Sequence, residues 1–172
     1  MKQLFIIFGI CLLSMVPLLV SCRDSQLGKP PVNLTKKSKA IQIPFNDRGC
    51  NQIWIPVSIN GVTMDMLYDT GFNGTVSMSL LELQTLYKNG RFSANDILGS
   101  SSACIADGSI VENGVVVLRS LKITNNMVIE NVSANVVLNQ EAPILLGREV
   151  FNDIARKVEV DDENKTLNIT PW

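Results

Sequence analysis

Apolar and polar residues alternate along most of the chain after residue 40, and this pattern predicts a protein built mainly of β-strands. Apolar side chains occupy every second position from Ile53 to Ile59 and again from Val62 to Tyr68. The two runs are separated only by Asn60-Gly61, a dipeptide that tolerates the positive φ angles of a type I′ turn. The sequence therefore predicts a tight β-hairpin over residues 53–68.

One short helix is predicted after this hairpin. The segment Ser79-Leu80-Leu81-Glu82 is a capping box, in which the serine and glutamate side chains satisfy free amides at the start of a helix. Met78 and Leu83 have the spacing of a hydrophobic staple, and the helical pattern ends at Asn89-Gly90.

The remainder of the chain returns to strand patterns. Asp107-Gly108 lies between two short apolar runs and predicts a second hairpin turn. Further strands are predicted at residues 115–118, 121–123, 128–138, 143–146, 158–160 and 166–169. Together these patterns indicate a single β-rich domain, which we place at residues 41–172.

The first 40 residues follow no strand pattern and are typical of an export signal and a linker. Lys2 precedes an apolar run that ends at Leu19-Val20-Ser21-Cys22, a tetrapeptide that resembles a bacterial lipobox. We expect residues 1–21 to be removed and Cys22 to be lipidated, which anchors the protein to a bacterial membrane on the periplasmic side or at the cell surface. An uncleaved anchor and an ordinary secretory signal are the alternatives, and all three export the chain. Residues 22–40 are polar and predict a flexible tether.

Composition excludes several kinds of chemistry. The chain has no histidine, so Ser-His-Asp, Cys-His and His-ligated metal sites are excluded, and we expect neither a metal ion nor a cofactor. Lys plus Arg number 15 against 16 Asp plus Glu, which leaves no basic surplus for binding nucleic acid. After processing, the remaining cysteines are Cys50 and Cys104, which either form a disulfide or remain two free thiols.

The candidate chemistry lies at the end of the first hairpin. Its second strand runs directly into Asp69-Thr70-Gly71, which places a partly desolvated carboxylate where an apolar strand meets a turn. Gly71 permits a sharp bend of the backbone, and the Thr70 hydroxyl can brace the turn against a neighbouring chain.

Three segments together resemble the retropepsin-like (clan AA) aspartic proteases, in their bacterial single-domain lipoprotein form, over about residues 41–170. They are Leu67-Tyr68-Asp69-Thr70-Gly71, the turn Ala106-Asp107-Gly108, and Ile144-Leu145-Leu146-Gly147-Arg148, in that order along the chain. The resemblance implies an all-β fold, a small closed β-barrel with one or two short helices.

The resemblance also implies an activity, the hydrolysis of peptide bonds in a peptide or protein substrate. Asp69, Thr70 and Gly71 would form the catalytic turn, and the segment Ala106-Asp107-Gly108 would form a flap over the substrate. Leu146, Gly147, Arg148 and Asn73 would support the catalytic turn. Because the chain has one Asp-Thr-Gly, the second carboxylate must come from another copy, so a homodimer is implied.

Two positions depart from the family pattern. Phe72 stands where the family usually has alanine or serine, and its ring could narrow a substrate subsite or shift the carboxylate. Asn73 stands where retroviral relatives have an acid that pairs with the arginine of the Leu-Gly-Arg segment, so Arg148 would have a neutral hydrogen-bond partner. Phe72 motivates an alternative hypothesis, a non-catalytic peptide-binding or assembly lipoprotein on the same fold.

Overall fold

The computed structural model describes residues 32–34, 40–104 and 108–172. The predicted signal segment, Cys22, most of the predicted tether, and Ala106 and Asp107 of the predicted flap lie outside the described residues. Among the helices that the structure describes, none has both the length and the apolar character needed to cross a membrane.

The described chain is dominated by strands, which confirms the predicted all-β class. The strands are β1 (Val32–Leu34), β2 (Ile41–Pro44), β3 (Asn46–Asp47), β4 (Ile53–Ile59), β5 (Val62–Asp69), β6 (Val76–Ser79), β7 (Ile97–Cys104), β8 (Ile110–Thr124), β9 (Met127–Val137), β10 (Leu145–Gly147), β11 (Ala155–Asp161) and β12 (Thr166–Pro171). The helices are α1 (Leu80–Lys88) and α2 (Glu149–Asn152), with a 3₁₀ turn at Ala94–Asp96.

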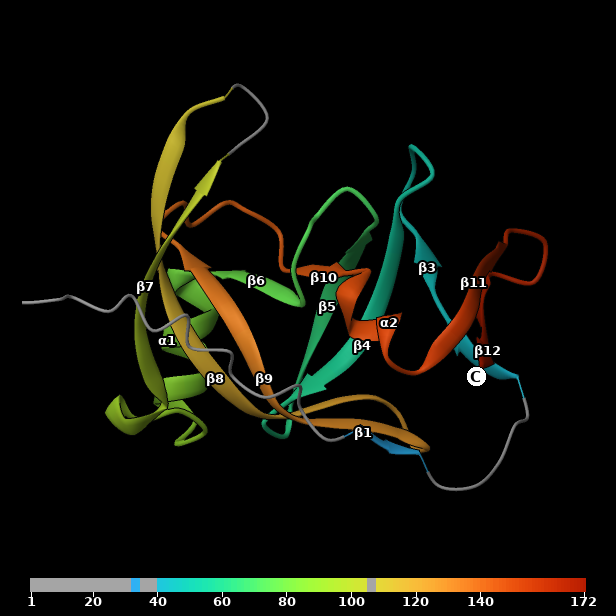
Figure 1. Cartoon of the computed structure of the whole chain (residues 1–172), viewed down its shortest axis with the longest axis horizontal. Coiled ribbons are helices and arrows are strands. Elements are labelled where there is room, and N and C mark those ends of the chain that lie inside the picture. Colours follow the sequence, from blue (N-terminus) through green and yellow to red (C-terminus); the bar gives the residue numbers. More distant parts are fainter. Residues whose placement is uncertain (1–31, 35–39, 105–107) are drawn as a thin grey trace, which may run out of the picture.

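Six strands close into a ring, because β8 pairs with β4 on one side and with β9 on the other. The order around the ring is β9-β6-β10-β5-β4-β8, and β1, β3 and β7 extend it at β9, β4 and β8. Strands β11, β12 and β2 form a second, three-stranded sheet, which lies at the opposite end of the molecule from α1 (Figure 1). The buried apolar side chains of both sheets and of the helices make one continuous core.

The first predicted hairpin is present as β4 and β5. Asn60 and Gly61 both have positive φ, 50° and 89°, as a type I′ turn requires. The Asn60 side chain also joins this turn to other segments: its Nδ2 donates to the Arg91 carbonyl at 2.8 Å, and its Oδ1 accepts from the Ser120 amide at 3.0 Å. These hydrogen bonds therefore hold the turn against β8 and against the segment that follows α1.

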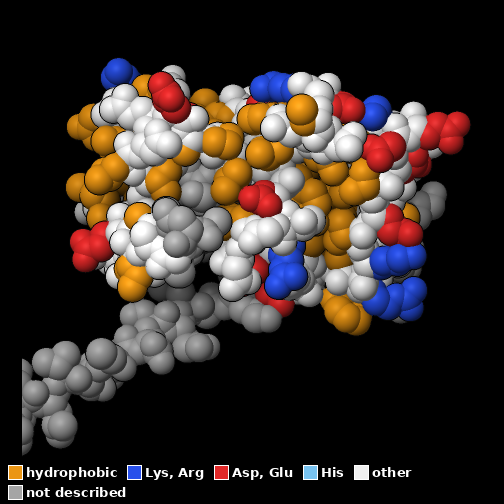
Figure 2. Space-filling view, turned by 90° about the horizontal axis from the view of Figure 1, so that it is seen from above, with side chains coloured by type: hydrophobic (Ala, Val, Ile, Leu, Met, Phe, Trp, Pro, Cys, Tyr) orange, Lys and Arg blue, Asp and Glu red, His pale blue; other side chains and the backbone are white. Residues whose placement is uncertain are grey.

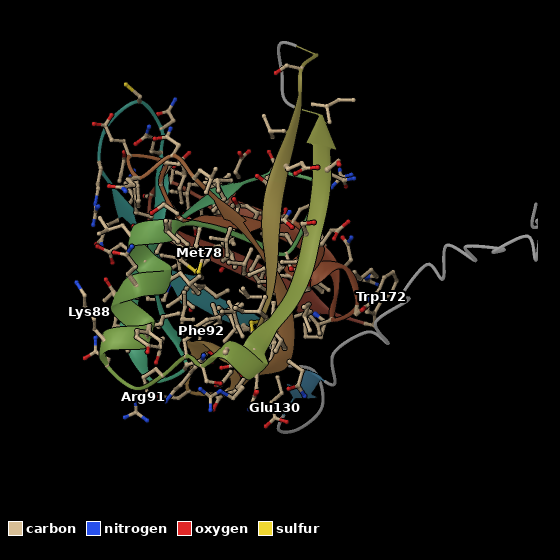
Figure 3. The ribbon with its side chains drawn as sticks, turned by 90° about the vertical axis from the view of Figure 1, so that its left-hand side faces the viewer. Met78, Lys88, Arg91, Phe92, Glu130 and Trp172 are labelled. Atoms are coloured by element: carbon tan, nitrogen blue, oxygen red, sulfur yellow. The ribbon has the colours of Figure 1, made fainter. Side chains whose placement is uncertain are left out.

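The predicted capping box is also present. The Ser79 side chain accepts from the Leu81 amide at 3.1 Å, and the Ser79 amide donates to Glu82 at 2.9 Å. Helix α1 lies against β6 and β9, and Met78 points from β6 into the interior beside the helix (Figure 3). These contacts join α1 to the strand that follows the Asp69 turn.

Three residues within the range predicted to be a tether belong to the sheet. Strand β1 pairs antiparallel with β9, with Val32 opposite Ile129 and Leu34 opposite Met127. The pairing uses a part of β9 that β6 does not cover, since β6 pairs only with residues 134–137 of β9. The chain that precedes the domain is therefore joined to the strand ring at these residues.

We predict a pH-dependent contribution to stability from Asp47, an exposed residue at the end of β3. Its carboxylate accepts from the Gly49 amide at 2.9 Å and from Lys165 at 3.2 Å, and these bonds lower the pKa of Asp47 below its ordinary value of 3.8. Because the folded pKa is the lower one, the contribution is present above pH 3.8 and is lost as the pH falls further. Asp47→Asn should therefore lower the melting temperature near neutral pH but not in strong acid. A difference that grew on acidification would contradict this assignment.

Candidate functional site

Asp69 is the last residue of β5, and the residue as a whole is half-buried. Its Oδ1 accepts a hydrogen bond from the Gly71 amide at 2.8 Å, and the Phe72 amide donates to the Asp69 carbonyl at 3.3 Å. These two bonds close a tight turn that holds the carboxylate in one orientation. The segment between β5 and β6 lies between the projecting β7–β8 hairpin and the β3–β4 loop (Figure 1). Thr70 is exposed at the apex of the turn.

Strand β10 packs beside this turn and holds it in place. It lies between β5 and β6, parallel to β5 and antiparallel to β6, and its register places Gly147 beside Asp69. The Gly147 amide donates to the Thr75 carbonyl at 2.9 Å, and Leu146 is buried in the core. The structure thus brings the segments around Asp69 and Gly147 together, although 78 residues separate them in the sequence.

Gly147 is a glycine because the loop that follows Asp69 rests directly on its backbone. A Cβ at Gly147 would lie 1.9 Å from the Gly74 carbonyl oxygen, a distance that no packing arrangement allows. Any other residue would therefore push the loop away from β10. This explains in physical terms why the supporting segment needs glycine next to the carboxylate.

Phe72 folds back over the same support. Its ring Cζ is 2.7 Å from the position of a Cβ on Gly74, and its Cδ1 is 2.8 Å from that of a Cβ on Gly147. The ring therefore packs over Gly74 and Gly147, and the absence of side chains at these two glycines leaves room for it. It is half-buried, so one part of the ring faces solvent.

A row of apolar side chains borders Asp69, and its residues were not among the predicted site residues. Trp54 and Leu145 both lie opposite Leu67 in the register, on β4 and β10. Because residues two apart in a strand share a face, Leu67 and Asp69 point to the same side. We call these half-buried residues (Trp54, Leu67 and Leu145) the apolar row. The alternation of side chains along the strand was the sequence signal that could have placed Leu67 on the same face as Asp69.

Figure 2 shows this upper face of the molecule, and hydrophobic side chains gather across its middle. Arg48 lies over the Trp54 ring, 4.5 Å from its centroid, and forms an ion pair with Asp65. These contacts fix the position of Trp54 at one end of the apolar row. A largely apolar surface with one oriented carboxylate is suited to an extended ligand that has apolar side chains.

Tyr68 directly precedes Asp69 in the chain, and Arg148 directly follows Gly147. The Tyr68 ring packs edge-to-face on Phe151 of α2 at 5.7 Å, and burial raises the pKa of Tyr68, opposed in part by the charge of Arg148. Arg148 and Asn73 are both exposed, and no hydrogen bond joins them in the described part of the single chain. The expected role of this pair in supporting the turn remains a prediction.

The predicted flap corresponds to the hairpin of β7 and β8, which projects above the ring (Figure 1). The two strands pair as far as Cys104 opposite Ile110, and Gly108 has a φ of +85°. Ala106 and Asp107, at the centre of the predicted flap, lie outside the described residues.

Cys50 is an exposed, free cysteine in the β3–β4 loop, far from the end of β7 that holds Cys104 (Figure 1). The structure therefore favours the free-thiol alternative at Cys50. Among the described residues, no group of three or more Cys, Asp or Glu side chains is placed to hold a metal ion.

Comparison with known proteins supports the fold. The chain is similar in structure to a retropepsin-like aspartic protease from Rickettsia conorii, with a TM-score of 0.56 and 19% sequence identity over 84% of this chain and 98% of that chain. This similarity confirms the retropepsin-like fold that the sequence motifs predicted. No protein-family model and no curated protein matches the sequence.

Proposed function

We propose that this chain is an aspartic endopeptidase that acts as a homodimer, with one Asp69 from each copy forming the catalytic pair. The observation that carries the proposal is the orientation of Asp69, whose Oδ1 accepts from the Gly71 amide while Gly147 lies beside it in the register. The similarity in fold to an aspartic protease supports the same reading. The chain has a single Asp-Thr-Gly, so a two-fold axis must supply the second carboxylate.

Two carboxylates within hydrogen-bonding distance cannot both ionise at low cost, so the pair would share one proton. The ionised Asp69 would take a proton from a water molecule held between the two acids, and that water would attack the peptide carbonyl. The protonated Asp69 would donate toward the carbonyl oxygen. The mechanism uses no cofactor and forms no covalent intermediate.

The substrate would be an extended peptide. The apolar row would hold an apolar side chain next to the bond that is cleaved, and the β7–β8 hairpin would cover the peptide and contribute backbone hydrogen bonds. We further propose that lipidation of Cys22 anchors this activity to a bacterial membrane, on the periplasmic side or at the cell surface. Metabolic labelling with a fatty-acid analogue, compared with Cys22→Ala, tests that anchor directly.

The activity is tested by incubating the full chain, in a mild detergent, with a mixed peptide library from acid to neutral pH. We expect cleavage next to apolar residues. Binding of peptides without cleavage at any pH would instead favour the non-catalytic peptide-binding alternative.

We also predict that activity depends on protein concentration. If the catalytic pair forms between two copies, the activity per chain should fall on dilution as the dimer dissociates. Activity assays over a dilution series, with sedimentation at the same concentrations, measure both quantities. An active monomer in sedimentation would refute the homodimer while leaving the endopeptidase open.

A further inference from the structure

Phe72 is the least expected residue of the Asp69 turn, and its surroundings indicate what it does. Its ring lies over Gly74 and Gly147, so close that a Cβ on either glycine would fall within 2.8 Å of a ring carbon. Gly74 belongs to the loop itself, whereas Gly147 belongs to β10. One side chain therefore contacts both the loop and the strand that supports it.

The backbone beneath the ring has few bonds to hold it. In the described chain, the Gly71 and Phe72 amides bind Asp69, and the Gly147 amide binds the Thr75 carbonyl, but no backbone hydrogen bond is found for Asn73 or Gly74. The segment at residues 73–74 is therefore held mainly by packing, and Phe72 provides that packing. Burying part of a phenyl ring stabilises such a contact through the hydrophobic effect.

We propose that Phe72 is a positioning residue, which packs on Gly74 and Gly147 and thereby holds the Gly71 amide against the Asp69 carboxylate. This inference deepens the proposed function, and its catalytic consequence rests on that function. It differs from the expectation that the ring narrows a substrate subsite, because the ring is directed at Gly74 of the loop and Gly147 of β10. Asp69 would lose orientation if the ring were removed.

The first test measures the geometry of the turn without any substrate. Water-exchange NMR on the full chain in detergent reports the exchange rate of the Gly71 amide, which slows when the amide donates a hydrogen bond. We expect Phe72→Ala to raise this rate by about tenfold. Phe72→Leu, which keeps an apolar branched side chain over the glycines, should stay close to the wild-type rate. An unchanged rate in Phe72→Ala would overturn the proposal.

The second test uses Gly74. A Cβ on Gly74 would lie 2.7 Å from the ring of Phe72, so Gly74→Ala should displace the ring and also raise the Gly71 exchange rate. In the Phe72→Ala background the added methyl group meets no ring, so it should add little. The two effects are therefore expected to be non-additive. Additive effects would contradict the contact. If Phe72→Ala does not fold, Gly74→Ala and Phe72→Leu still test the proposal, because Gly74→Ala should raise the Gly71 exchange rate and Phe72→Leu should leave it close to the wild-type rate.

The third test separates positioning from specificity. With a cleaved peptide, Phe72→Ala should lower kcat about tenfold and leave KM within about twofold, because the substrate still binds while the carboxylate is less well oriented. A changed KM with a new preference for larger side chains would instead show a subsite residue. If no peptide is cleaved but the NMR coupling is present, the proposed endopeptidase fails and the positioning role of Phe72 stands.

Discussion

Asp69→Asn is expected to abolish peptide cleavage, with a loss of at least about 10³-fold in kcat. The change removes the ionised oxygen that would accept a proton from water, and a homodimer loses both members of the catalytic pair at once. The fold should persist, because the asparagine side chain keeps an oxygen that can accept from the Gly71 amide. The measurement is the rate of cleavage of a defined peptide, with the melting temperature taken on the same sample.

Asp162→Asn is the matched control, since it makes the same chemical change at an exposed residue of the β11–β12 turn. It should leave cleavage unchanged. Mixing offers a sharper test of the shared site: an excess of Asp69→Asn chains should inhibit the wild type, because each mixed dimer contains only one carboxylate. Equal activity of Asp69→Asn and wild type would reject Asp69 as a catalytic residue.

Gly147→Ala is expected to destabilise the protein by about 3 kcal/mol or more, a large value for the addition of one methyl group. The new Cβ would lie 1.9 Å from the Gly74 carbonyl oxygen, and this atom belongs to the backbone, so it cannot rotate away. The loop must shift, and the hydrogen bond from the Gly147 amide to the Thr75 carbonyl is strained or lost. Chemical denaturation measures the change in unfolding free energy.

Gly114→Ala provides the comparison, because Gly114 is also a strand glycine without a positive φ. A Cβ there would lie 3.6 Å from the Val136 Cβ, an ordinary contact. The substitution should be neutral or stabilise the protein by up to about 1 kcal/mol, since alanine restricts the unfolded chain more than glycine does. Similar losses at both glycines would mean that close packing at Gly147 is not the cause.

Local sequence signals predicted the parts of the fold that depend on neighbouring residues. The Asn60-Gly61 turn and the Ser79 capping box are each specified by a few adjacent side chains, and both are present in the structure. The strand alternation also predicted the all-β class. The parallel pairing of β10 with β5 joins residues far apart in the chain, and no local pattern specifies such a pairing.

Other elements likewise depend on contacts that no local sequence pattern specifies. Two separate strands were predicted at residues 115–118 and 121–123, whereas β8 continues through Arg119 and Ser120 because β9 pairs with it on both sides of this point, with Leu118 opposite Val132 and Ser120 opposite Glu130. The resemblance implied one or two short helices, but no local pattern located α2, because its four residues are too few to show a helical period. The sequence identified Phe72 as unusual, but the direction of its ring depends on Gly147, 75 positions away.

The amide of Asn60 has a further consequence, for the chemical ageing of the protein. Asparagine followed by glycine is prone to lose ammonia, because the glycine nitrogen can attack the side-chain carbonyl and close a five-membered ring. Here both ends of the amide are occupied, by the Arg91 carbonyl and the Ser120 amide. Ring closure would have to break these bonds first, so the fold protects this Asn-Gly dipeptide in the hairpin that ends at Asp69.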